Sequence, residues 1–586
     1  MSLAKDWVIA APWGGREGLA ASLRISPVVA QVLHNRGIDD AETARQFLTP
    51  QLADLYAPET LPGTTAAAER IHAAIRAGEK IVLFGDYDVD GITGVSILWH
   101  CLRLAGATAG FYIPHRVEEG YGISTEAIDK IADDGPRLII TVDCGVTAIE
   151  PAARARQRGV DLIITDHHTP HTDDAGKPEL PDAILVHPGI ARPGEQGYPN
   201  PDLSGAGVAF KLAWAVAQRV SNSTKVKPEF RDFLVDATGL AALGIVADVV
   251  PLAGENRIIA HQGLRGLPHS RLPGIQALIQ ASGLTGKRLD GYDVGFKLAP
   301  RLNAIGRMGH AQLAVEMMTR ATPEEAVRIA ANLEQHNRAR QGVEREIFQA
   351  ARRMVVEQGQ DSDAVRAVVL ASPDWHVGVI GIVAGRIVEE FGRPTVLIAL
   401  DGEAGQGSGR SIRHFPLHEV LAECRGHLVA YGGHAMAAGL KIEAGKVGAF
   451  REAFQQRAAQ LLTPADLRPK LNVDDVVGLT QLSEQLVADL GRLEPFGAGN
   501  PSPKLATDWL DVVGDPRAVG GSGTHLQLTL GRGGTRCKAI AFGKANLLPQ
   551  LQDHRRCRVA FQPIVNEWNG RRSVEMQVID FQFPQE

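Results

Sequence analysis

Short apolar runs in the first half of the chain end abruptly in acidic or imidazole side chains, and this pattern limits the possible folds more than any other feature. The runs occupy residues 81–85, 110–114, 137–143, 161–166 and 183–188. Helical patterns separate several of them, which predicts βαβ units and a mostly parallel sheet. Because ligands of such sheets bind beyond the carboxyl ends of the strands, the polar residues after each run are the expected site of chemistry.

The first run leads into three alternating carboxylates, Asp86, Asp88 and Asp90, followed by Gly91. Held together without a counter-charge, these groups would repel one another and raise one another's pKa values. A divalent cation would remove that repulsion, and hard carboxylate oxygens suit Mg²⁺ or Mn²⁺. For this segment alone, a calcium-like loop or a solvated turn is an equal alternative.

Three later segments bring further acids and histidines. Asp143 follows the third run, Asp166, His167 and His168 follow the fourth, and Asp248 lies in an apolar stretch. Each residue alone is more often structural than a ligand, but four such segments in order within one α/β region favour a metal site. The set holds carboxylates and imidazole but no thiolate, and it exceeds the needs of one ion. We therefore expect two divalent cations, Mn²⁺ or Mg²⁺.

The rest of the chain divides by pattern. Thr322 to Glu325 begins a long charged helix, which we expect to connect two α/β regions. Glycine-rich segments at 405–411 and 431–439 are expected to be loops of the second region. Alternating segments near the C terminus predict a small antiparallel barrel, an OB-fold. The predicted domains are an N-terminal accessory segment (1–65), a parallel-sheet α/β domain (66–295), a connecting helical linker (296–358), a smaller α/β domain (359–465), and a helical lead-in with the barrel (466–586).

Cysteine use and hydropathy predict the compartment. The five cysteines form no CxxC pair, so neither disulfides nor a cysteine zinc site are expected, and a reducing compartment fits best. The first residues lack the apolar stretch of a signal peptide, and no run reaches the roughly 18 apolar residues of a membrane span. We therefore expect a cytoplasmic protein.

Motifs along nearly the whole chain resemble one family. They are GDYDVDG (85–91), TVDCG (141–145), TDHH (165–168), GIVADVVPL (244–252), PRLNAIGRMG (300–309), WHVGVIGIVAGR (375–386), GSGRSI (407–412), GGHAMAAG (432–439) and EPFGAGNPSP (494–503). In this order they resemble the DHH/DHHA1 phosphoesterase superfamily and, within it, the bacterial RecJ family of single-strand-specific 5′→3′ exonucleases. Together they are highly specific, whereas any one of them would be weak.

The resemblance implies a role for each residue of the metal site. Asp88 and Asp90 should bind different metals, and Asp143 should bridge them. His167 and Asp248 should complete the second site.

By the same resemblance, Asp86 should complete the first site. The wider superfamily often has a histidine two residues earlier, where this chain has Phe84. His168 should support the site or touch the scissile phosphate rather than bind metal directly. His434 should lie near the same scissile group.

The resemblance also implies contacts to DNA. Arg116, Ser408 and Arg410 should hold the 5′-terminal phosphate, because arginine forks and exposed backbone N–H groups suit phosphate oxygens. Taken alone, an arginine such as Arg116 or Arg410 is more often part of a surface salt bridge.

Linker and barrel residues supply further candidates. In the linker, Arg301, Asn303 and Arg307 are either DNA contacts or a structural anchor between domains. Barrel arginines beside Trp568 suit single-strand binding, with an ordinary solvated face as the alternative. These arginines are Arg555, Arg556, Arg558, Arg571 and Arg572.

The implied function is hydrolysis of single-stranded DNA from its 5′ end by a two-metal mechanism that releases 5′-mononucleotides, in DNA repair and recombination. The implied partners are a single-strand-binding protein and a RecQ-type helicase, and a monomer is expected. Two alternatives stay open. One is a DHH phosphodiesterase for short oligonucleotides or cyclic dinucleotides. The other is a non-catalytic replication scaffold, which would have lost its metal ligands.

Net charge bears on the DNA prediction. A formal charge of −6 and 5% aromatic residues argue weakly against a nucleic-acid binder. The charge is unevenly distributed, however, because residues 297–353 carry a net +4 and residues 501–586 a net +3. Phosphate contacts are local, so we expect binding in a channel lined by the linker, the arginine loops and the barrel, with an acidic exterior elsewhere.

Overall fold

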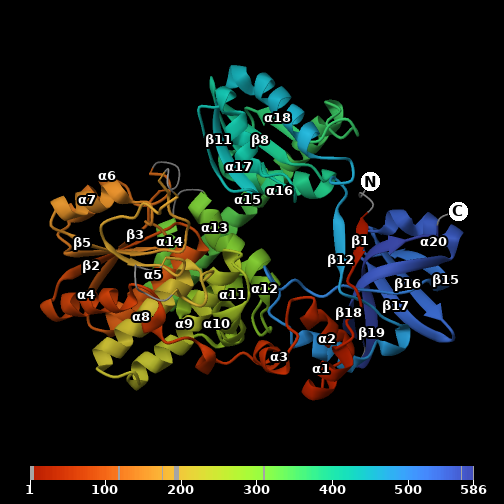
Figure 1. Ribbon diagram of the computed structural model, residues 1–586, viewed down its shortest axis with the longest axis horizontal. Coiled ribbons are helices and arrows are strands. Elements are labelled where there is room, and N and C mark those ends of the chain that lie inside the picture. The colour runs from red at the N-terminus through yellow and green to blue at the C-terminus, as the bar shows by residue number, and fades with distance from the viewer. Residues whose placement is uncertain are drawn as a thin grey trace. The chain divides into compact units, whose positions relative to one another are not determined.

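The computed structural model describes residues 5–115, 119–173, 176–190, 197–307, 311–568 and 570–584, except for the side chains of Arg307 and Trp568. The chain divides into two compact units. Figure 1 labels their helices and strands. The parallel-sheet unit comprises Ile38–Asn337 and Leu490–Ser502, and the two-sheet unit comprises Met1–Gly37, Arg338–Asp489 and Pro503–Glu586. The finer domain boundaries given above stay predictions.

The predicted N-terminal segment 1–65 is divided between these units. Its first strand, β1 (Asp6–Ile9), pairs in parallel with β12 (Lys470–Val473) of the two-sheet unit. Helices α1 (Arg16–Leu23) and α2 (Pro27–His34) follow in the same unit, whereas α3 (Ala41–Leu48) belongs to the parallel-sheet unit.

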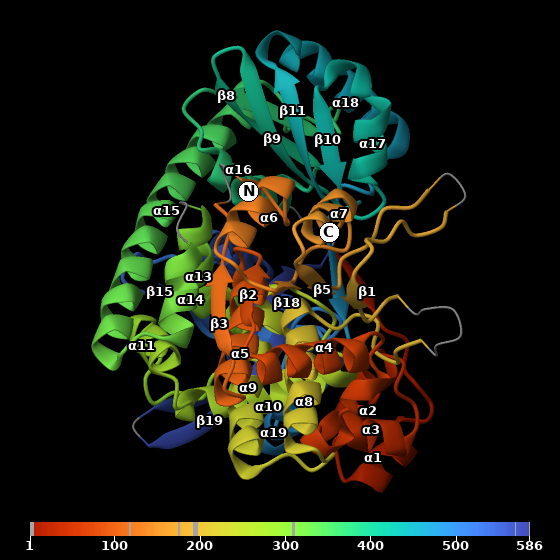
Figure 2. The same ribbon diagram turned by 90° about the vertical axis from the view of Figure 1, so that its left-hand side faces the viewer.

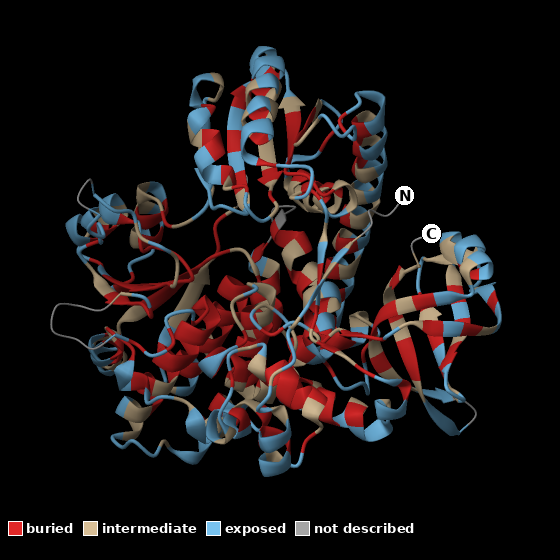
Figure 3. Cartoon of the chain, turned by 45° about the vertical axis from the view of Figure 1, so that its right-hand side comes forward, coloured by how far each residue is buried: buried red, intermediate tan, exposed pale blue. Residues whose placement is uncertain are grey.

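The predicted parallel sheet is confirmed. Its strand order is β3-β2-β4-β5-β6, and every neighbouring pair is parallel. All residues of β4 are buried, and Figure 3 shows the strands of this sheet mostly in the buried colour. Burial on both faces explains why the sequence shows continuous apolar runs rather than alternation. The strands are β2 (Lys80–Gly85), β3 (Thr108–Tyr112), β4 (Leu138–Val142), β5 (Asp161–Thr165) and β6 (Ile184–Val186).

Two sets of helices cover the two faces of this sheet. Ile81 and Leu83 of β2 share a core with α4, α5 and α8, whereas Val82 and Phe84 share a core with α6 and α7. This division follows from the opposite directions of successive side chains along a strand. The helices are α4 (Thr64–Ala77), α5 (Val89–Leu104), α6 (Thr125–Asp133), α7 (Ile149–Gln157) and α8 (Gly205–Ser221).

A helical region and the predicted long helix follow. Helix α15 (Pro323–Glu357) is continuous over 35 residues (Figure 2). Its start is a capping box: Glu325 N donates to Thr322 Oγ1 at 3.2 Å, and Thr322 N donates to Glu325 Oε2 at 2.9 Å. Before it come α9 (Pro228–Ala247), α10 (Gly254–Gly266), α11 (Pro273–Ala281), α12 (Gly291–Asp293), the π-helix η4 (Val294–Leu298), α13 (Ala299–Arg307) and α14 (Ala311–Thr319).

The second α/β region is confirmed as a five-stranded sheet of order β10-β11-β9-β8-β7, in which only β7 and β8 are parallel. Its strands are β7 (Val368–Ser372), β8 (Thr395–Asp401), β9 (Ala404–Arg410), β10 (Ala430–Gly433) and β11 (Ala437–Glu443). Its helices are α16 (Val377–Phe391), α17 (Leu417–Glu423) and α18 (Val447–Leu461).

The prediction that the glycine-rich segments of this region are loops is wrong, because they form β9, β10 and the start of β11. In β9, a Cβ added to Gly407 would lie 2.8 Å from the Leu440 side chain, and one added to Gly409 would lie 2.8 Å from Leu417. Alternate glycines therefore make room for close packing on one face, while Ser408 and Arg410 point to the other.

The predicted C-terminal barrel is confirmed. Strands β15, β16, β17, β19 and β18 pair successively into a closed ring, consistent with an OB-fold. The barrel strands are β15 (Leu510–Val519), β16 (His525–Arg532), β17 (Thr535–Ala541), β18 (Arg556–Trp568) and β19 (Arg571–Gln582). The accompanying elements are β13 (Asp475–Val476), α19 (Glu484–Gly491), β14 (Leu505–Ala506) and α20 (Leu548–His554). Across the described residues, the helices lack the combination of length and hydropathy that a membrane span requires.

Candidate metal centre

The first acidic segment turns sharply from β2 into α5. Asp88 is the N-cap of α5, and its Oδ1 accepts hydrogen bonds from Asp90 N at 2.9 Å and Gly91 N at 3.2 Å. Asp86 and Asp90 are buried. A side chain at position 91 would clash with the backbone of Asp86, since an added Cβ would lie 2.5 Å from the Asp86 carbonyl oxygen. The DxDxDG pattern is therefore required by the turn as well as by its carboxylates.

Asp90 is anchored by the N-terminus of α8. Its carboxylate accepts hydrogen bonds from Gly205 N at 2.6 Å and Ala206 N at 3.0 Å. Burial, together with the charges of Asp248 and Asp88, nevertheless raises the pKa of Asp90 well above its ordinary value. The backbone fixes the position of this carboxylate without neutralising its charge.

Asp143 follows β4 in a strained conformation. Its φ is +64°, in the left-handed region that non-glycine residues rarely adopt, and its side chain is 2% exposed. A Cβ added to Gly205 would lie 2.4 Å from Asp143 Oδ1, so the start of α8 must approach this carboxylate closely. Burial and the charge of Asp90 raise the pKa of Asp143 well above its ordinary value.

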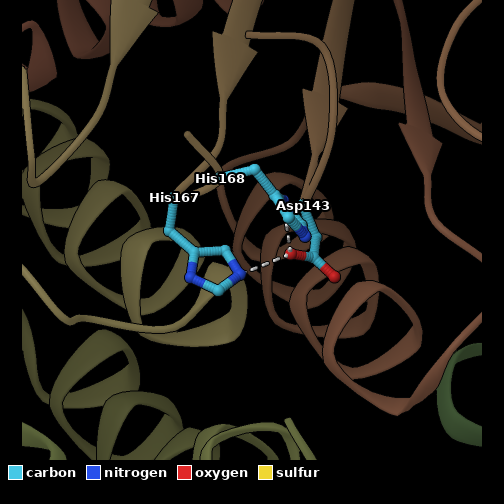
Figure 4. Close-up of side chains that lie close together, drawn as sticks. All are labelled: Asp143, His167 and His168. Atoms are coloured by element: carbon cyan, nitrogen blue, oxygen red, sulfur yellow. Dashed lines mark ion pairs between the residues drawn. The ribbon is translucent and has the colours of Figure 1, made fainter. Parts of the chain in front are cut away.

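His167 points into the group of carboxylates, as Figure 4 shows for its contact with Asp143. Its Nε2 lies 3.2 Å from Asp143 Oδ1, 3.5 Å from Asp248 Oδ2 and 3.9 Å from Asp90 Oδ2. Burial and the charge of His168 lower the pKa of His167 to about 4, so its imidazole is neutral at pH 7. Among the described residues, neither His167 Nε2 nor Asp143 Oδ1 has a hydrogen-bond partner, although both atoms are buried.

These atoms form overlapping groups that fit divalent cations. In each group, one ligand atom from every member lies within 4.8 Å of the others. Neutral imidazole and carboxylate are suitable ligands for Mn²⁺ and Mg²⁺. A bound cation would offset the repulsion between the carboxylates and give the unpaired nitrogen and oxygen atoms a partner. The groups are Asp86–Asp88–Asp143, Asp90–His167–Asp248 and Asp143–His167–His168.

Asp166 has a positioning role that the sequence left unassigned. Its Oδ1 lies 2.7 Å from His168 Nδ1, and it also accepts hydrogen bonds from the backbone N–H groups of His167 and His168. Burial raises the pKa of Asp166, but the hydrogen bond and charge of His168 outweigh it and lower the pKa. Burial likewise lowers the pKa of His168, but Asp166 outweighs it and raises the pKa to about 9. The two residues are thus an ion pair at neutral pH.

Tyr121 is a contact that the sequence reasoning missed. Its hydroxyl lies 3.1 Å from His168 Nδ1 and donates a hydrogen bond to the Asp143 carbonyl oxygen at 3.3 Å. The signal was available, because Tyr121 lies in the polar segment after β3, at the same edge of the sheet as the other ligands.

Comparison with known proteins identifies the family. Family models match at residues 80–245 (DHH family, N-terminal domain), 364–460 (DHHA1 domain) and 473–580 (RecJ OB domain). The chain is 40% identical over 567 residues to the single-stranded-DNA-specific exonuclease RecJ of Bacillus subtilis (strain 168), a match that covers 96% of this chain and 69% of that protein. The chain belongs to the RecJ family.

The single-stranded-DNA-specific exonuclease RecJ of Thermus thermophilus is 35% identical to this chain, and the match covers 97% of this chain and 77% of that protein. A crystal structure of RecJ from Thermus thermophilus in complex with Mn²⁺ matches with a TM-score of 0.82 at 31% identity, covering 99% of this chain and 80% of that chain. The corresponding Mg²⁺ complex matches with a TM-score of 0.77 at 30% identity, covering 99% of this chain and 79% of that chain.

Two of the predicted 5′-phosphate residues of this RecJ-family chain, Ser408 and Arg410, lie in the two-sheet unit. Arg410 Nη1 donates to Ser408 Oγ at 3.1 Å and to the Gly409 carbonyl at 2.8 Å, and burial lowers the pKa of Arg410. Both side chains lie against α16, since a Cβ added to Gly381 would be 2.8 Å from Ser408 Oγ and 3.0 Å from Arg410 Nη2. That they face the substrate stays a prediction, and Arg116 lies outside the described residues.

The other predicted RecJ contacts have different surroundings. His434 is exposed in the turn between β10 and β11, where its N–H donates to the Ala437 carbonyl at 2.8 Å. Arg301 forms an ion pair with Glu334 at 2.8 Å, as a structural anchor would, and Asn303 Oδ1 is buried without a hydrogen-bond partner in the described part of the chain. The side chain of Arg307 is outside the described set.

Proposed function

We propose that this RecJ-family chain is a metal-dependent exonuclease that degrades single-stranded DNA from the 5′ end and releases 5′-mononucleotides. The observation that carries the proposal is the close approach of Asp143 Oδ1 and His167 Nε2. These two atoms are buried 3.2 Å apart among carboxylates of raised pKa, and neither has a hydrogen-bond partner in the part of the chain that the structure describes. Such a cluster is stable in its ionised form only around cations. The names of the RecJ relatives, which are single-stranded-DNA-specific exonucleases, support the substrate.

The donor set suits two divalent cations, Mn²⁺ or Mg²⁺. The crystal structures of relatives with either ion support this choice. When bound, the cations would act as Lewis acids and lower the pKa of a coordinated water towards neutrality. We assign Asp86 and Asp88 to the first ion, Asp90, His167 and Asp248 to the second, and Asp143 to a bridging position.

His168 is suited to contact the scissile phosphate. Its pKa of about 9 leaves the ring protonated at neutral pH, with Nδ1–H donated to Asp166. The charged ring can then donate a hydrogen bond to a phosphoryl oxygen, where negative charge develops during the reaction. Asp166 keeps the ring in this orientation, and we assign His434 a place near the same group.

Ser408 and Arg410, with Arg116, would hold the 5′-terminal phosphate. The orientation of Arg410 by Ser408 Oγ and the Gly409 carbonyl supports this role, because a guanidinium that is already positioned loses little entropy when it binds phosphate. Capture of a terminal phosphate at a fixed distance from the metals would make the enzyme an exonuclease rather than an endonuclease.

The wider setting is also a proposal. We place the enzyme in DNA repair and recombination, acting as a monomer with a single-strand-binding protein and a RecQ-type helicase as partners. The five cysteines are free and buried, which supports work in the reducing cytoplasm.

The test compares end-labelled DNA substrates in the presence of Mn²⁺ or Mg²⁺. Linear single strands with a 5′-phosphate should be degraded to mononucleotides, while strands with a blocked 5′ end, circular single strands and blunt duplexes should resist.

Degradation of circles would overturn the assignment as an exonuclease, and release from the 3′ end would overturn the assigned 5′→3′ polarity. Cleavage confined to very short oligonucleotides or cyclic dinucleotides would favour a different DHH phosphodiesterase. No hydrolysis with either metal would favour a scaffold, against which the full set of ligands argues.

A further inference from the structure

Two aromatic side chains stand exposed on one helical stretch of the parallel-sheet unit. Tyr292 is 61% exposed and Phe296 is 68% exposed. Their ring centroids lie 4.7 Å apart with an interplanar angle of 25°, so the rings are stacked. Aromatic rings are among the side chains that gain most from burial, and two adjacent rings left in water mark a contact surface.

The backbone directs both rings outward. Tyr292 lies in α12 and Phe296 in the π-helix η4, whose residues Val294 and Leu298 are fully buried. Pro300 has no N–H to donate to the Phe296 carbonyl, which interrupts regular α-helical bonding at this point, and the wider π turn leads the chain into α13. The orientation of the pair is therefore fixed by the fold.

Charged side chains of both signs surround the pair, with Asp290 and Asp293 at the start of the same stretch. Lys297 Nζ lies 5.6 Å from the Tyr292 ring centroid but is paired with Asp293 at 2.6 Å. Arg288 is paired with Glu494 at 2.8 Å. Exposed stacked rings beside carboxylates, with Lys297 already paired, suit the faces of bases better than phosphates.

The same stretch is joined to the helix that holds the predicted DNA contacts. Arg301 Nη1, from α13, donates a hydrogen bond to the Lys297 carbonyl at 2.5 Å. Asn303 lies two residues further along α13. Tyr292 and Phe296 therefore precede the predicted DNA contacts of α13 by only a few residues along the chain.

We propose that Tyr292 and Phe296 form a stacking platform for bases of single-stranded DNA. The inference rests on the proposed function, which supplies the ligand. Stacking on aromatic rings tolerates any sequence because every base has a π face. The platform would thus hold the strand without reading it, and a protein partner on the same apolar face is an alternative that the following experiment separates.

The test measures binding of short oligothymidylates by fluorescence anisotropy in Mn²⁺, with phosphorothioate linkages at the 5′ end to slow hydrolysis. A single abasic residue is moved along the strand. For the wild-type protein, affinity should fall about 5- to 10-fold when the abasic residue occupies one or two adjacent positions.

Variants then assign the effect to the two rings. Tyr292→Leu and Phe296→Leu keep apolar bulk without a π face, and each should weaken binding of the intact strand about 5-fold and remove the abasic effect. Phe296→Trp should keep both the affinity for the intact strand and the loss of affinity caused by the abasic residue. Val235→Ala, at a separate exposed apolar position on α9, serves as the matched control and should change neither. The dependence of affinity on salt should be the same for every variant, since bases and not phosphates are contacted.

The proposed stacking role would be contradicted if the abasic residue caused no loss of affinity in the wild-type protein. It would also be contradicted if that loss of affinity persisted in both leucine variants. A lower salt dependence in those variants would also overturn it, by assigning the loss to phosphate contacts. If wild-type protein still degrades the unmodified strand in either case, the proposed function stands while this inference fails. No degradation by the wild-type protein would instead overturn the proposed function.

Discussion

Two groups of buried charges in the parallel-sheet unit differ in how their charges are compensated. Lys211 and Glu255 are 0% and 1% exposed, and their ion pair spans 2.8 Å. Glu255 also accepts hydrogen bonds from the Tyr56 backbone N–H at 2.9 Å and from the Tyr198 hydroxyl, while Lys211 donates to the Tyr56 carbonyl. Each charge therefore has an opposite charge and further polar partners within the chain.

The carboxylate cluster is compensated only in part, because the protonated His168 is paired with Asp166 at 2.7 Å and lies 3.9 Å from Asp143 Oδ1. Asp90 and Asp143 both lie beside a neutral His167. Burial raises the pKa of both carboxyls; the charges of Asp248 and Asp88 further raise that of Asp90, and the charge of Asp90 further raises that of Asp143. The charges of the Lys–Glu pair are satisfied within the chain, whereas the ionised form of the cluster needs a cation to supply the missing charge. The comparison separates a structural network from a functional site by charge balance, not by burial.

The largest expected effect is on activity. Asp143→Ala should reduce hydrolysis of single-stranded DNA by about 10³-fold or more, because it removes the carboxylate shared by the ligand groups. It should also abolish the rise in thermal stability that Mn²⁺ gives the wild-type protein, which differential scanning fluorimetry measures. Asp182→Ala removes an exposed carboxylate and is the matched control. Near-normal turnover in Asp143→Ala would refute the bridging assignment.

The second effect is on stability alone. Lys211→Met leaves Glu255 buried without its counter-charge and should lower the free energy of unfolding by about 3–5 kcal/mol, measured by urea denaturation. The double variant Lys211→Met, Glu255→Leu should recover part of this loss. Hydrolysis per folded molecule should stay unchanged, and a loss of activity without a loss of stability would contradict the structural role of the pair.

The third effect links the cluster to pH. In the metal-free protein, burial and the charge of Asp88 raise the pKa of Asp248 to about 7 from an ordinary 3.8. The folded state thus holds this proton more tightly than the unfolded state. The resulting stability is present below about pH 4 and is lost as the pH rises to about 7.

The comparison that isolates this group is wild type against Asp248→Asn, unfolded in urea with EDTA at pH 5 and pH 7.5. Relative to the variant, the wild-type protein should lose about 1–3 kcal/mol over this interval. Mn²⁺ at about 100 times its dissociation constant should raise the free energy of unfolding by about 2.7 kcal/mol. At a fixed Mn²⁺ concentration this gain should be larger at the higher pH, because the cation binds the ionised carboxyl. A wild-type protein that gains stability with pH relative to the variant in EDTA would contradict the sign.

The sequence predicted the acidic cluster because both its signals are local. A buried strand shows its apolar run within a few residues, and the acids that follow Gly85 and Val142 stand directly after such runs. The Lys211–Glu255 pair was not predictable in this way, because its members are far apart along the chain and each resembles an ordinary charge on a helix. Strand β9 was missed for another reason: the glycines that its packing requires have the composition of a loop.

The smallest effect concerns Tyr121, a neutral group at the edge of the charged cluster. Tyr121→Phe removes the hydroxyl that contacts the Asp143 carbonyl and His168, but it changes no charge. One hydrogen bond contributes about 0.5–1.5 kcal/mol, so kcat/KM on single-stranded DNA should fall only about 2- to 10-fold. Mn²⁺ should still stabilise the variant as it does the wild type, because every carboxylate ligand is retained. A loss of activity as large as that of Asp143→Ala would mean that Tyr121 acts on the reacting group itself, and charge balance would then be insufficient to distinguish the functional residues of this site from those that only position them.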